Sequence, residues 1–343
     1  MIRPGPRNLI SDVDGIAVGH AHDERWRSGA TIILPARPAL AAVDVRGGGP
    51  GTRETDLLNP LNRVDRVDAI VLAGGSVFGL DAAGGAAHWL YEQGRGLEVR
   101  GQRVPLVPAA ILFDLANGGD KSWAGEPPYR ALGRAACANA GADFALGNAG
   151  AGYGALAGQL KGGLGSASAV APDGLQVGAL VAANPIGSVV DHRTGAFWAQ
   201  PDAFGDELGP TRPYGAPLHD LDLPPDTKLG QYQTGLESNL AGASTSIGVI
   251  ATNARLNKAE AARLSTMAHD GLARAIRPVH TPLDGDTLFV LATGTHDLHE
   301  PRDVALTRLG HLAAVCVARA VARAVLEAQS LGQMQSWRAR YAG

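Results

Sequence analysis

The composition changes abruptly at residue 245, and this boundary constrains the fold more than any other feature of the chain. Residues 200–244 are rich in Pro, Gly, Asp and other polar residues, include GPTRPYGAP and LPPDTK, and have no clean periodicity. A strand-like run, TSIGVIAT, begins directly afterwards at Thr245. Composition of this kind predicts a mobile linker over about 200–244 between two ordered blocks. The boundary is either a surface loop that meets a core strand, which is the simpler interpretation, or a processing site.

Short β-branched runs alternate with Gly-rich turns in the first third of the chain. The runs over Ala30–Pro35, Ala41–Val45 and Ala69–Leu72 predict strands. A hairpin over Thr31–Val45 would indicate antiparallel pairing rather than a simple βαβ series. The segment Asp81–Gln93, which follows the turn GGSVFG, is expected to form a helix.

The rest of the chain also has clear element signals. The run KGGLGSASA, Lys161–Ala169, opens a predicted hairpin whose second strand ends at Asn184. Three further elements are expected: a helix capped by Asn257, a strand over Thr287–Thr293 and a long helix from about Arg302 to Ala328.

Composition excludes several classes of protein. The 343 residues are 45% hydrophobic, which is enough for a large core, and the net charge of −3 without a basic run argues against nucleic-acid binding. Cys137 and Cys316 lie in Ala-rich helical stretches and are expected to be buried, inert thiols, so the cytoplasm is the default location. The N-terminus lacks an apolar signal region, and Arg interrupts the longest apolar stretches, so no membrane span is expected.

Three adjacent hydroxyls, Ser244, Thr245 and Ser246, stand at the boundary. A Ser or Thr hydroxyl is a weak nucleophile until a base removes its proton. If Thr245 became N-terminal, its own α-amine, which titrates near ~8, would be such a base. The same hydroxyl can first attack the carbonyl of Ser244 in an N-to-O acyl shift, and the ester then hydrolyses. The alternative is that these residues serve only the strand, for which Thr has a good propensity.

Four other residues carry candidate chemistry. Asp284 and Asp286 flank a glycine just before a strand; DGD is a turn signal, but two close carboxylates can also orient an ammonium and a hydroxyl. Lys161 is either solvated or a cation beside a reacting carbonyl. Asn184 either makes a local turn bond or donates its amide N–H to an oxyanion.

No cofactor or metal site is expected. Turn formation explains the glycine clusters better than phosphate binding does, because none matches a nucleotide fingerprint: Gly47–Gly49, Gly74–Gly75 and Gly162–Gly163. His20 and His22 lack a second ligand cluster. His269 and His280 lie in or near helical segments and are expected to be packing or capping residues.

Several motifs, in one order over nearly the whole chain, carry a family resemblance. They include SDVDGIAVGHAHD, VDVRGGGPGTRETDLL, VLAGGSVFGLDAAGG, KGGLGSAS, TSIGVIATNARL and RPVHTPLDGDTLFVLATG. With these motifs the chain resembles the P1 family of self-processing N-terminal nucleophile hydrolases (peptidase family S58). That family includes L-aminopeptidase/D-esterases, β-peptidyl aminopeptidases and 6-aminohexanoate-oligomer (nylon oligomer) hydrolases.

The resemblance implies an α+β fold, a four-layer αββα sandwich formed by residues 1–343 as one domain. It also implies cleavage into Met1–Ser244 and Thr245–Gly343, which stay together, and a tetramer of cleaved pairs. By similarity to the nylon-oligomer branch, the catalytic residues would be Thr245, Lys161, Asn184, Asp284 and Asp286.

This chain differs from the aminopeptidase branch at several positions and from the family pattern before the scissile bond. The aminopeptidase branch has a Ser nucleophile, a Ser/Glu pair in place of the two aspartates and a Tyr shortly before KGG, where this chain has Gly158, although Tyr153 lies nearby. The residue before the scissile bond is Ser244 rather than Asn or Gly, so cleavage one residue away stays open.

Alternative functions follow from these residues. One is an autoprocessed amidase acting on linear amides such as 6-aminohexanoate oligomers. A second is an aminopeptidase, D-amino-acid esterase or β-peptidyl aminopeptidase acting on short peptides, which an acidic pocket for the substrate amine would favour. A third is an uncleaved, non-catalytic binding protein. Acyl transfer to an amine, as in the ornithine acetyltransferases of related fold, is a minor alternative.

Overall fold

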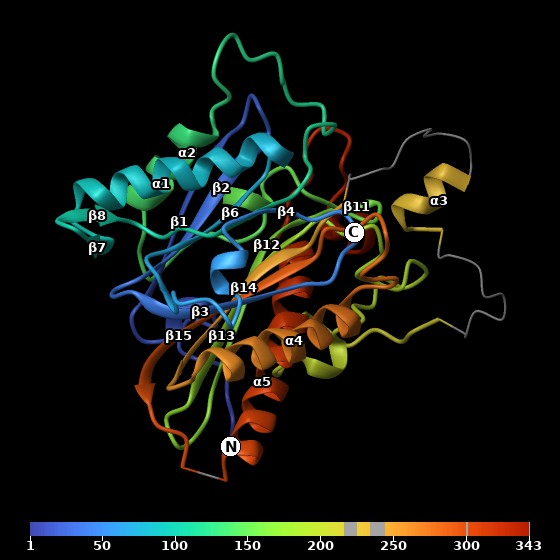
Figure 1. Ribbon diagram of the computed structural model, residues 1–343. Coiled ribbons are helices and arrows are strands. Elements are labelled where there is room, and N and C mark those ends of the chain that lie inside the picture. Colours follow the sequence, from blue (N-terminus) through green and yellow to red (C-terminus); the bar gives the residue numbers. More distant parts are fainter. Residues whose placement is uncertain (216–224, 234–243, 300, 343) are drawn as a thin grey trace.

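The computed structural model describes residues 1–215, 225–233, 244–299 and 301–342, and of 231–233 only the backbone. Two β-sheets lie face to face between helices (Figure 1). The larger sheet has six strands, in the order β12 (Gly163–Val170), β13 (Gln176–Ala183), β14 (Ile247–Ala254), β15 (Thr287–His296), β3 (Ala39–Val45) and β5 (Arg66–Val67). Its strands pair antiparallel except β14 and β15, which are parallel.

The second sheet has five strands. Their order is β1 (Ile16–Asp23), β2 (Ser28–Pro35), β6 (Ile70–Ala73), β9 (Ala109–Ile111) and β4 (Gly51–Arg53). Two small ribbons complete the described strands: β10 (Leu156–Ala157) with β11 (Leu160–Lys161), and β7 (Leu97–Val99) with β8 (Gln102–Val104).

Helices cover the outer face of each sheet. α1 (Asp81–Glu92) and α2 (Tyr129–Ala138) pack on the five-stranded sheet, and α4 (Lys258–Ala275) and α5 (Arg302–Leu326) pack on the six-stranded sheet. Shorter elements are α3 (Lys228–Gln233), α6 (Trp337–Tyr341) and the 3₁₀ turns Ile10–Asp12, Asp56–Leu58, Ser76–Leu80, Gly150–Gly152 and Gln200–Asp202.

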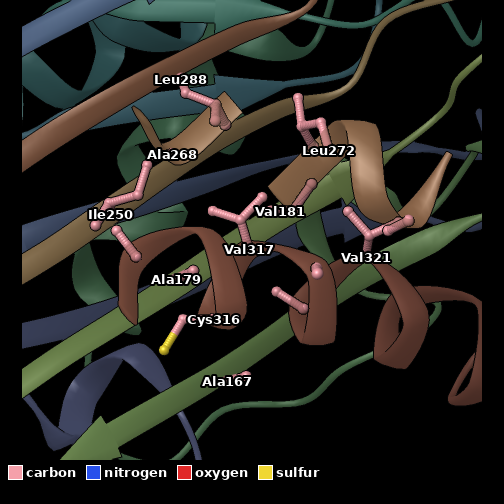
Figure 2. Close-up of a cluster of buried hydrophobic side chains, with 14 of the residues drawn as sticks. Ala167, Ala179, Val181, Ile250, Ala268, Leu272, Leu288, Cys316, Val317 and Val321 are labelled. Carbon is pink, nitrogen blue, oxygen red and sulfur yellow. The ribbon is translucent and has the colours of Figure 1, made fainter. Parts of the chain in front are cut away.

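Three buried apolar clusters separate the four layers. One lies between the sheets, one between the five-stranded sheet and α1/α2, and one between the six-stranded sheet and α4/α5. Figure 2 shows part of the last, where Val317 and Val321 of α5 pack near Val181 of β13. The predicted α+β fold, a four-layer αββα sandwich, is confirmed.

The expected hairpin over Thr31–Val45 is wrong. β2 pairs with β1 and β6, whereas β3 pairs with β15 and β5, so the two runs lie in different sheets. Both strands are largely buried, and Pro38 in the link is unsuited to a tight hairpin turn. Local patterning identifies a strand but not its partner: β2 pairs with the strand before it, β1, whereas β3 pairs with β15, which is far away in the sequence.

Other element predictions hold. Asn257 caps α4 by accepting the Glu260 N–H, and the Glu260 carboxylate accepts the Asn257 N–H in return. Cys137 and Cys316 are buried free thiols. By length and composition α5 could cross a membrane, but 89% of that stretch is buried inside the protein, as expected for a core helix.

The predicted mobile linker over 200–244 is described only in part, because 216–224 and 234–243 lie outside the described residues. The described parts contain a 3₁₀ turn at Gln200–Asp202 and the helix α3. They also reach the core: the Glu207 carboxylate pairs with the fully buried Arg319 of α5. Mobility of the linker stays a prediction.

Candidate active site

Thr245 stands at the entrance to β14, between the ends of β13 and β15. Its side chain is buried, and its N–H donates to the carbonyl oxygen of Asn184 at 2.9 Å. The Thr245 Oγ1 hydroxyl donates to the carbonyl oxygen of Ser244 at 2.5 Å. That same carbonyl accepts the N–H of Gly285 at 3.0 Å. The hydroxyl therefore lies against the peptide group that it would attack, and a backbone donor faces the oxygen on which negative charge would develop.

Gly285 allows this close approach because it has no side chain. A Cβ at this position would lie 2.7 Å from Thr245 Oγ1 and 2.7 Å from the carbonyl oxygen of Gly49. Both distances are shorter than real Cβ contacts, so the hydroxyl or the loop would have to move.

We expect G285A to slow cleavage of the Ser244–Thr245 bond by about 100-fold, because displacement of a reacting group by about 1 Å has an effect of that size. The measurement is the fraction of cleaved chain against time by intact mass. G141A is the matched control, since a Cβ there meets only an ordinary contact at 3.9 Å. Wild-type cleavage in G285A would show that the hydroxyl does not need this position.

The two aspartates hold the loops around Thr245. Both are fully buried. Asp284 accepts the N–H of Ile186 at 3.0 Å and both the N–H and the hydroxyl of Thr281 at 3.1 and 2.7 Å. Asp286 accepts the N–H of Ser246, next to Thr245, at 2.8 Å. The predicted proximity of the DGD turn and Thr245 is thus present in the fold.

Burial, and secondly the charge of Asp286, raise the pKa of Asp284. Two carboxyls in one buried site resist double ionisation, so a proton is more easily retained on Asp284 than on an exposed aspartate. Such a site can both accept hydrogen bonds and exchange a proton.

The glycine cluster Gly47–Gly49 packs against this turn. A Cβ on Gly47 would lie 2.3 Å from the carbonyl oxygen of Asp284, and the Gly49 N–H donates to that oxygen at 2.8 Å. Gly47, together with Gly48, where a Cβ would lie 2.5 Å from the carbonyl oxygen of Pro282, is needed for this close backbone contact.

Asn184 follows β13 and faces Thr245 through its backbone. Its carbonyl accepts the Thr245 N–H, its side-chain Oδ1 accepts the N–H of Leu156 at 2.9 Å, and its Nδ2 donates to the carbonyl of Phe113 at 3.1 Å. By these contacts Asn184 fixes the backbone of Thr245 relative to Leu156 and Phe113. Its predicted donation to an oxyanion stays a prediction.

Lys161 lies on β11 and is fully buried. Among the described contacts its ammonium donates to the carbonyls of Gly152 and Gly162 at 3.2 and 2.6 Å, not to Thr245. Leu156 connects it to the site, because Leu156 pairs with Lys161 and donates to Asn184. Burial lowers the pKa of Lys161 from 10.5 to about 7, and Asp114 opposes this shift.

The titration of Lys161 predicts a pH-dependent stability. Between pH 7 and 10.5 the unfolded chain binds more protons at this group than the folded chain, so folding becomes more favourable as pH rises. K161M lacks this dependence. Its stability relative to the parent is therefore expected to be greatest below pH 7 and to fall by up to ~1.4 kcal/mol per pH unit above it.

Urea unfolding at several pH values, with T245A in both chains to keep them whole, measures this difference. The control pair carries K258M, because Lys258 is a lysine at a partly exposed position with three carbonyl partners. A K161M difference that does not change with pH would contradict the lowered pKa.

Asp114 was not predicted as a site residue, although it is the one charged residue in the apolar run LVPAAILFDL, Leu106–Leu115. It is buried, and burial raises its pKa to about 6, while the charges of Lys121 and Lys161 oppose the rise. The preceding residue, Phe113, accepts the side-chain N–H of Asn184. A buried carboxyl thus follows directly, in the sequence, the residue whose carbonyl binds Asn184.

Two further residues at the site were not predicted. One is His280, which was expected to be a packing or capping residue. Its ring nitrogen Nδ1 lies 2.8 Å from Asp286 Oδ2, and its backbone N–H donates to the same oxygen at 3.2 Å. Its place in RPVHTPLDGDT, six residues before Asp286, was the available signal. The other is Lys228, whose ammonium contacts Asn184 and Ser244; its polar segment offered no signal.

Other candidates lie away from Thr245. His20 Nδ1 contacts Thr31 Oγ1, and His22 stacks on Tyr153. Within the described parts of the chain, no group of three or more His, Cys, Asp or Glu side chains is placed to hold a metal ion.

Solved structures share this architecture. The L-aminopeptidase D-Ala-esterase/amidase of Ochrobactrum anthropi, described as a variant of the Ntn-hydrolase fold, aligns with a TM-score of 0.70 and 22% identity over 96% of this chain and 89% of that chain. A Burkholderia sp. β-aminopeptidase aligns with a TM-score of 0.67 and 22% identity over 99% and 93%. The fold is that of the Ntn-hydrolase aminopeptidases.

Residues 8–338 match peptidase family S58, and the chain belongs to this family. "Uncharacterized aminopeptidase Rv1333" of Mycobacterium tuberculosis is 44% identical over 98% of both chains. The 6-aminohexanoate-oligomer endohydrolase of Paenarthrobacter ureafaciens is 33% identical over 86% of this chain and 77% of that protein. The resemblance stated from the motifs is confirmed, and the protein is a hydrolase that acts on amide bonds.

Proposed function

We propose that the chain cleaves itself between Ser244 and Thr245 and that Thr245, as the new N-terminus, is the nucleophile of a linear-amide hydrolase. One observation carries the proposal. The Thr245 hydroxyl lies 2.5 Å from the carbonyl oxygen of Ser244, and the Gly285 N–H donates to that oxygen. Nucleophile, scissile carbonyl and oxyanion donor are thus together in the uncleaved chain.

Self-cleavage proceeds in two steps. Thr245 Oγ1 attacks the carbonyl carbon of Ser244 and loses its proton, the C–N bond breaks, and the nitrogen of Thr245 takes up a proton. This N-to-O acyl shift leaves an ester between Ser244 and the side chain of Thr245. Water then hydrolyses the ester, which releases the carboxylate of Ser244 and restores the hydroxyl.

The sheet would hold the two fragments together. β14, which begins two residues after the scissile bond, pairs with β13 of the 1–244 fragment and with β15 of the 245–343 fragment. β15 in turn pairs with β3 of the first fragment. Cleavage therefore leaves these strand pairs intact.

Substrate hydrolysis uses the same groups. The free α-amine of Thr245 removes the proton from its own hydroxyl, which attacks the amide carbonyl of the substrate. Asp286 holds Ser246, next to Thr245, and Asp284 holds the loops at Ile186 and Thr281. Gly285 N–H, with Asn184 and Lys161, stabilises the oxyanion. The amine product leaves, and water releases the acyl group.

The substrate class is a linear amide, with 6-aminohexanoate oligomers as the first candidate. Threonine, lysine, asparagine and the DGDT aspartates match the nylon-oligomer pattern residue by residue. An aminopeptidase acting on short peptides is the second candidate. It is favoured by the aminopeptidase relatives at 44% identity. Initial rates on 6-aminohexanoate dimer and on amino-acid p-nitroanilides separate the two.

Intact mass measurement of the purified protein tests self-cleavage. The expected result is two species, residues 1–244 and 245–343, with the smaller one beginning Thr-Ser-Ile. A single 35.3 kDa chain with full hydrolytic activity would overturn the proposal.

We also propose a tetramer of cleaved pairs and a cytoplasmic location. The tetramer follows from the family resemblance, and light scattering coupled to size exclusion measures it. The two buried thiols, which form no disulfide, fit a reducing compartment.

A further inference from the structure

Lys228, the first residue of α3, sends its side chain into the site around the scissile bond. It is only 5% exposed. Its ammonium Nζ lies 3.2 Å from the carbonyl oxygen of Asn184, 3.2 Å from Asn184 Oδ1 and 3.1 Å from Ser244 Oγ. These acceptors belong to segments that are about 60 residues apart in the sequence and meet at Thr245.

The segment that carries Lys228 is docked independently of the ammonium. The Lys228 N–H donates to the carbonyl of Ile186 at 3.0 Å, and the buried Asp226 carboxylate accepts the hydroxyl of Ser188. Both partners lie in the loop that follows Asn184. These two hydrogen bonds fix the backbone of the segment against the loop after Asn184, so the position of the Lys228 side chain is defined.

The contacts of the ammonium lie on both sides of the bond to be broken. Asn184 O, which accepts from Lys228, also accepts the N–H of Thr245, the nitrogen that leaves during the acyl shift. Ser244 Oγ, another described partner, belongs to the residue that contributes the reacting carbonyl. Lys228 thus connects the group that binds the leaving nitrogen of Thr245 with Ser244, the acyl side of the scissile bond.

We propose that Lys228 is a positioning residue for self-cleavage: its ammonium ties Ser244 to Asn184 and holds the scissile peptide against Thr245. The inference rests on the proposed cleavage between Ser244 and Thr245. Holding reacting groups in place removes orientational entropy from the barrier, and a cation close to the reacting carbonyl favours the negative charge that develops there. Lys228 takes no part in bond making.

The test compares K228M, K228R and K258M with the wild-type chain. Each is made by cell-free synthesis, and the fraction cleaved is followed by intact mass. Methionine keeps the length of the side chain and removes its charge, whereas arginine keeps the charge and its donors. Lys258 is the matched control, because its ammonium is likewise bound by oxygen atoms, the carbonyls of Asn59, Asn62 and Val64, each at 2.7 Å.

The expected result is cleavage at least tenfold slower in K228M, partial rescue in K228R and an unchanged rate in K258M. Wild-type cleavage in K228M, or a rate in K228R no higher than in K228M, would overturn the assignment. Thermal unfolding of T245A and T245A/K228M, both uncleaved, separates positioning from folding. Similar cooperative transitions support positioning, and loss of the transition in the double variant would contradict it.

Failure of the proposed function gives a different result from failure of this inference. If the wild-type chain itself stays whole, self-cleavage is wrong. If the wild-type chain is cleaved before Thr245 and K228M is cleaved equally fast, only the role of Lys228 is wrong.

Discussion

A T245A chain is expected to stay whole at 35.3 kDa and to lose amide hydrolysis by a factor on the order of 10⁴ or more. Alanine removes the hydroxyl that lies against the Ser244 carbonyl, and with it the attacking atom of both the self-cleavage and the substrate reactions. The loss should be this large because no neighbouring group can replace the nucleophile in the same position. Denaturing electrophoresis and a hydrolysis assay measure the two effects.

Two variants at neighbouring positions serve as controls. T245S keeps a hydroxyl and is expected to cleave itself, though at a different rate because the smaller side chain is less restricted. S246A should cleave at the wild-type rate, because Ser246 Oγ has no hydrogen-bond partner among the described residues. If S246A instead stays whole while T245A is cleaved, the nucleophile is one residue further along the chain.

D286N is expected to slow both reactions at least 100-fold. One carboxylate oxygen of Asp286 accepts the N–H of Ser246 and the other accepts the N–H of His280. An amide places an NH₂ group against one of these backbone donors in either orientation. One buried N–H then lacks an acceptor, which costs roughly 1–3 kcal/mol, and the residue next to Thr245 or the loop at His280 shifts.

The readouts for D286N are the cleavage rate by intact mass and kcat/KM of the fraction that has been cleaved. D297N is the matched control, because Asp297 lies just past the opposite end of β15 and its ion pair with Arg255 is exposed. A D286N chain that cleaves itself and hydrolyses substrate like D297N would exclude Asp286 from the site.

Much of the fold was readable from local signals. The capping box at Asn257, the helical stripe of α5 and the strand runs of β13 and β15 depend on neighbours within a few residues, so the sequence predicted them. The choice between a neighbouring and a distant partner depends on the packing of the whole fold: β2 pairs with its neighbour β1, and β3 pairs with the distant β15. For that reason the expected hairpin of β2 with β3 failed, and the two strands entered different sheets.

The site residues likewise fall into those that local sequence signals predicted and those that only the fold brings together. A hydroxyl cluster at a composition boundary and a DGD turn are compact signals, and the family motifs made them specific. His280 and Lys228 carried no comparable signal. A histidine between two prolines and a lysine in a Pro-rich polar segment become site residues only because folding brings them to Asp286 and Asn184.

The sequence by itself indicated a cluster of hydroxyls directly before a buried strand, the carboxylates that precede the neighbouring strand, and the family to which the chain belongs. Only the tertiary structure decided how these groups face one another. Gly285 donates its N–H to the Ser244 carbonyl against which Thr245 Oγ1 lies, and Lys228 links the two sides of the Ser244–Thr245 bond. The physical reason is that close approach and hydrogen bonding act through space, between strands and loops whose separation along the chain says nothing of their distance in the fold.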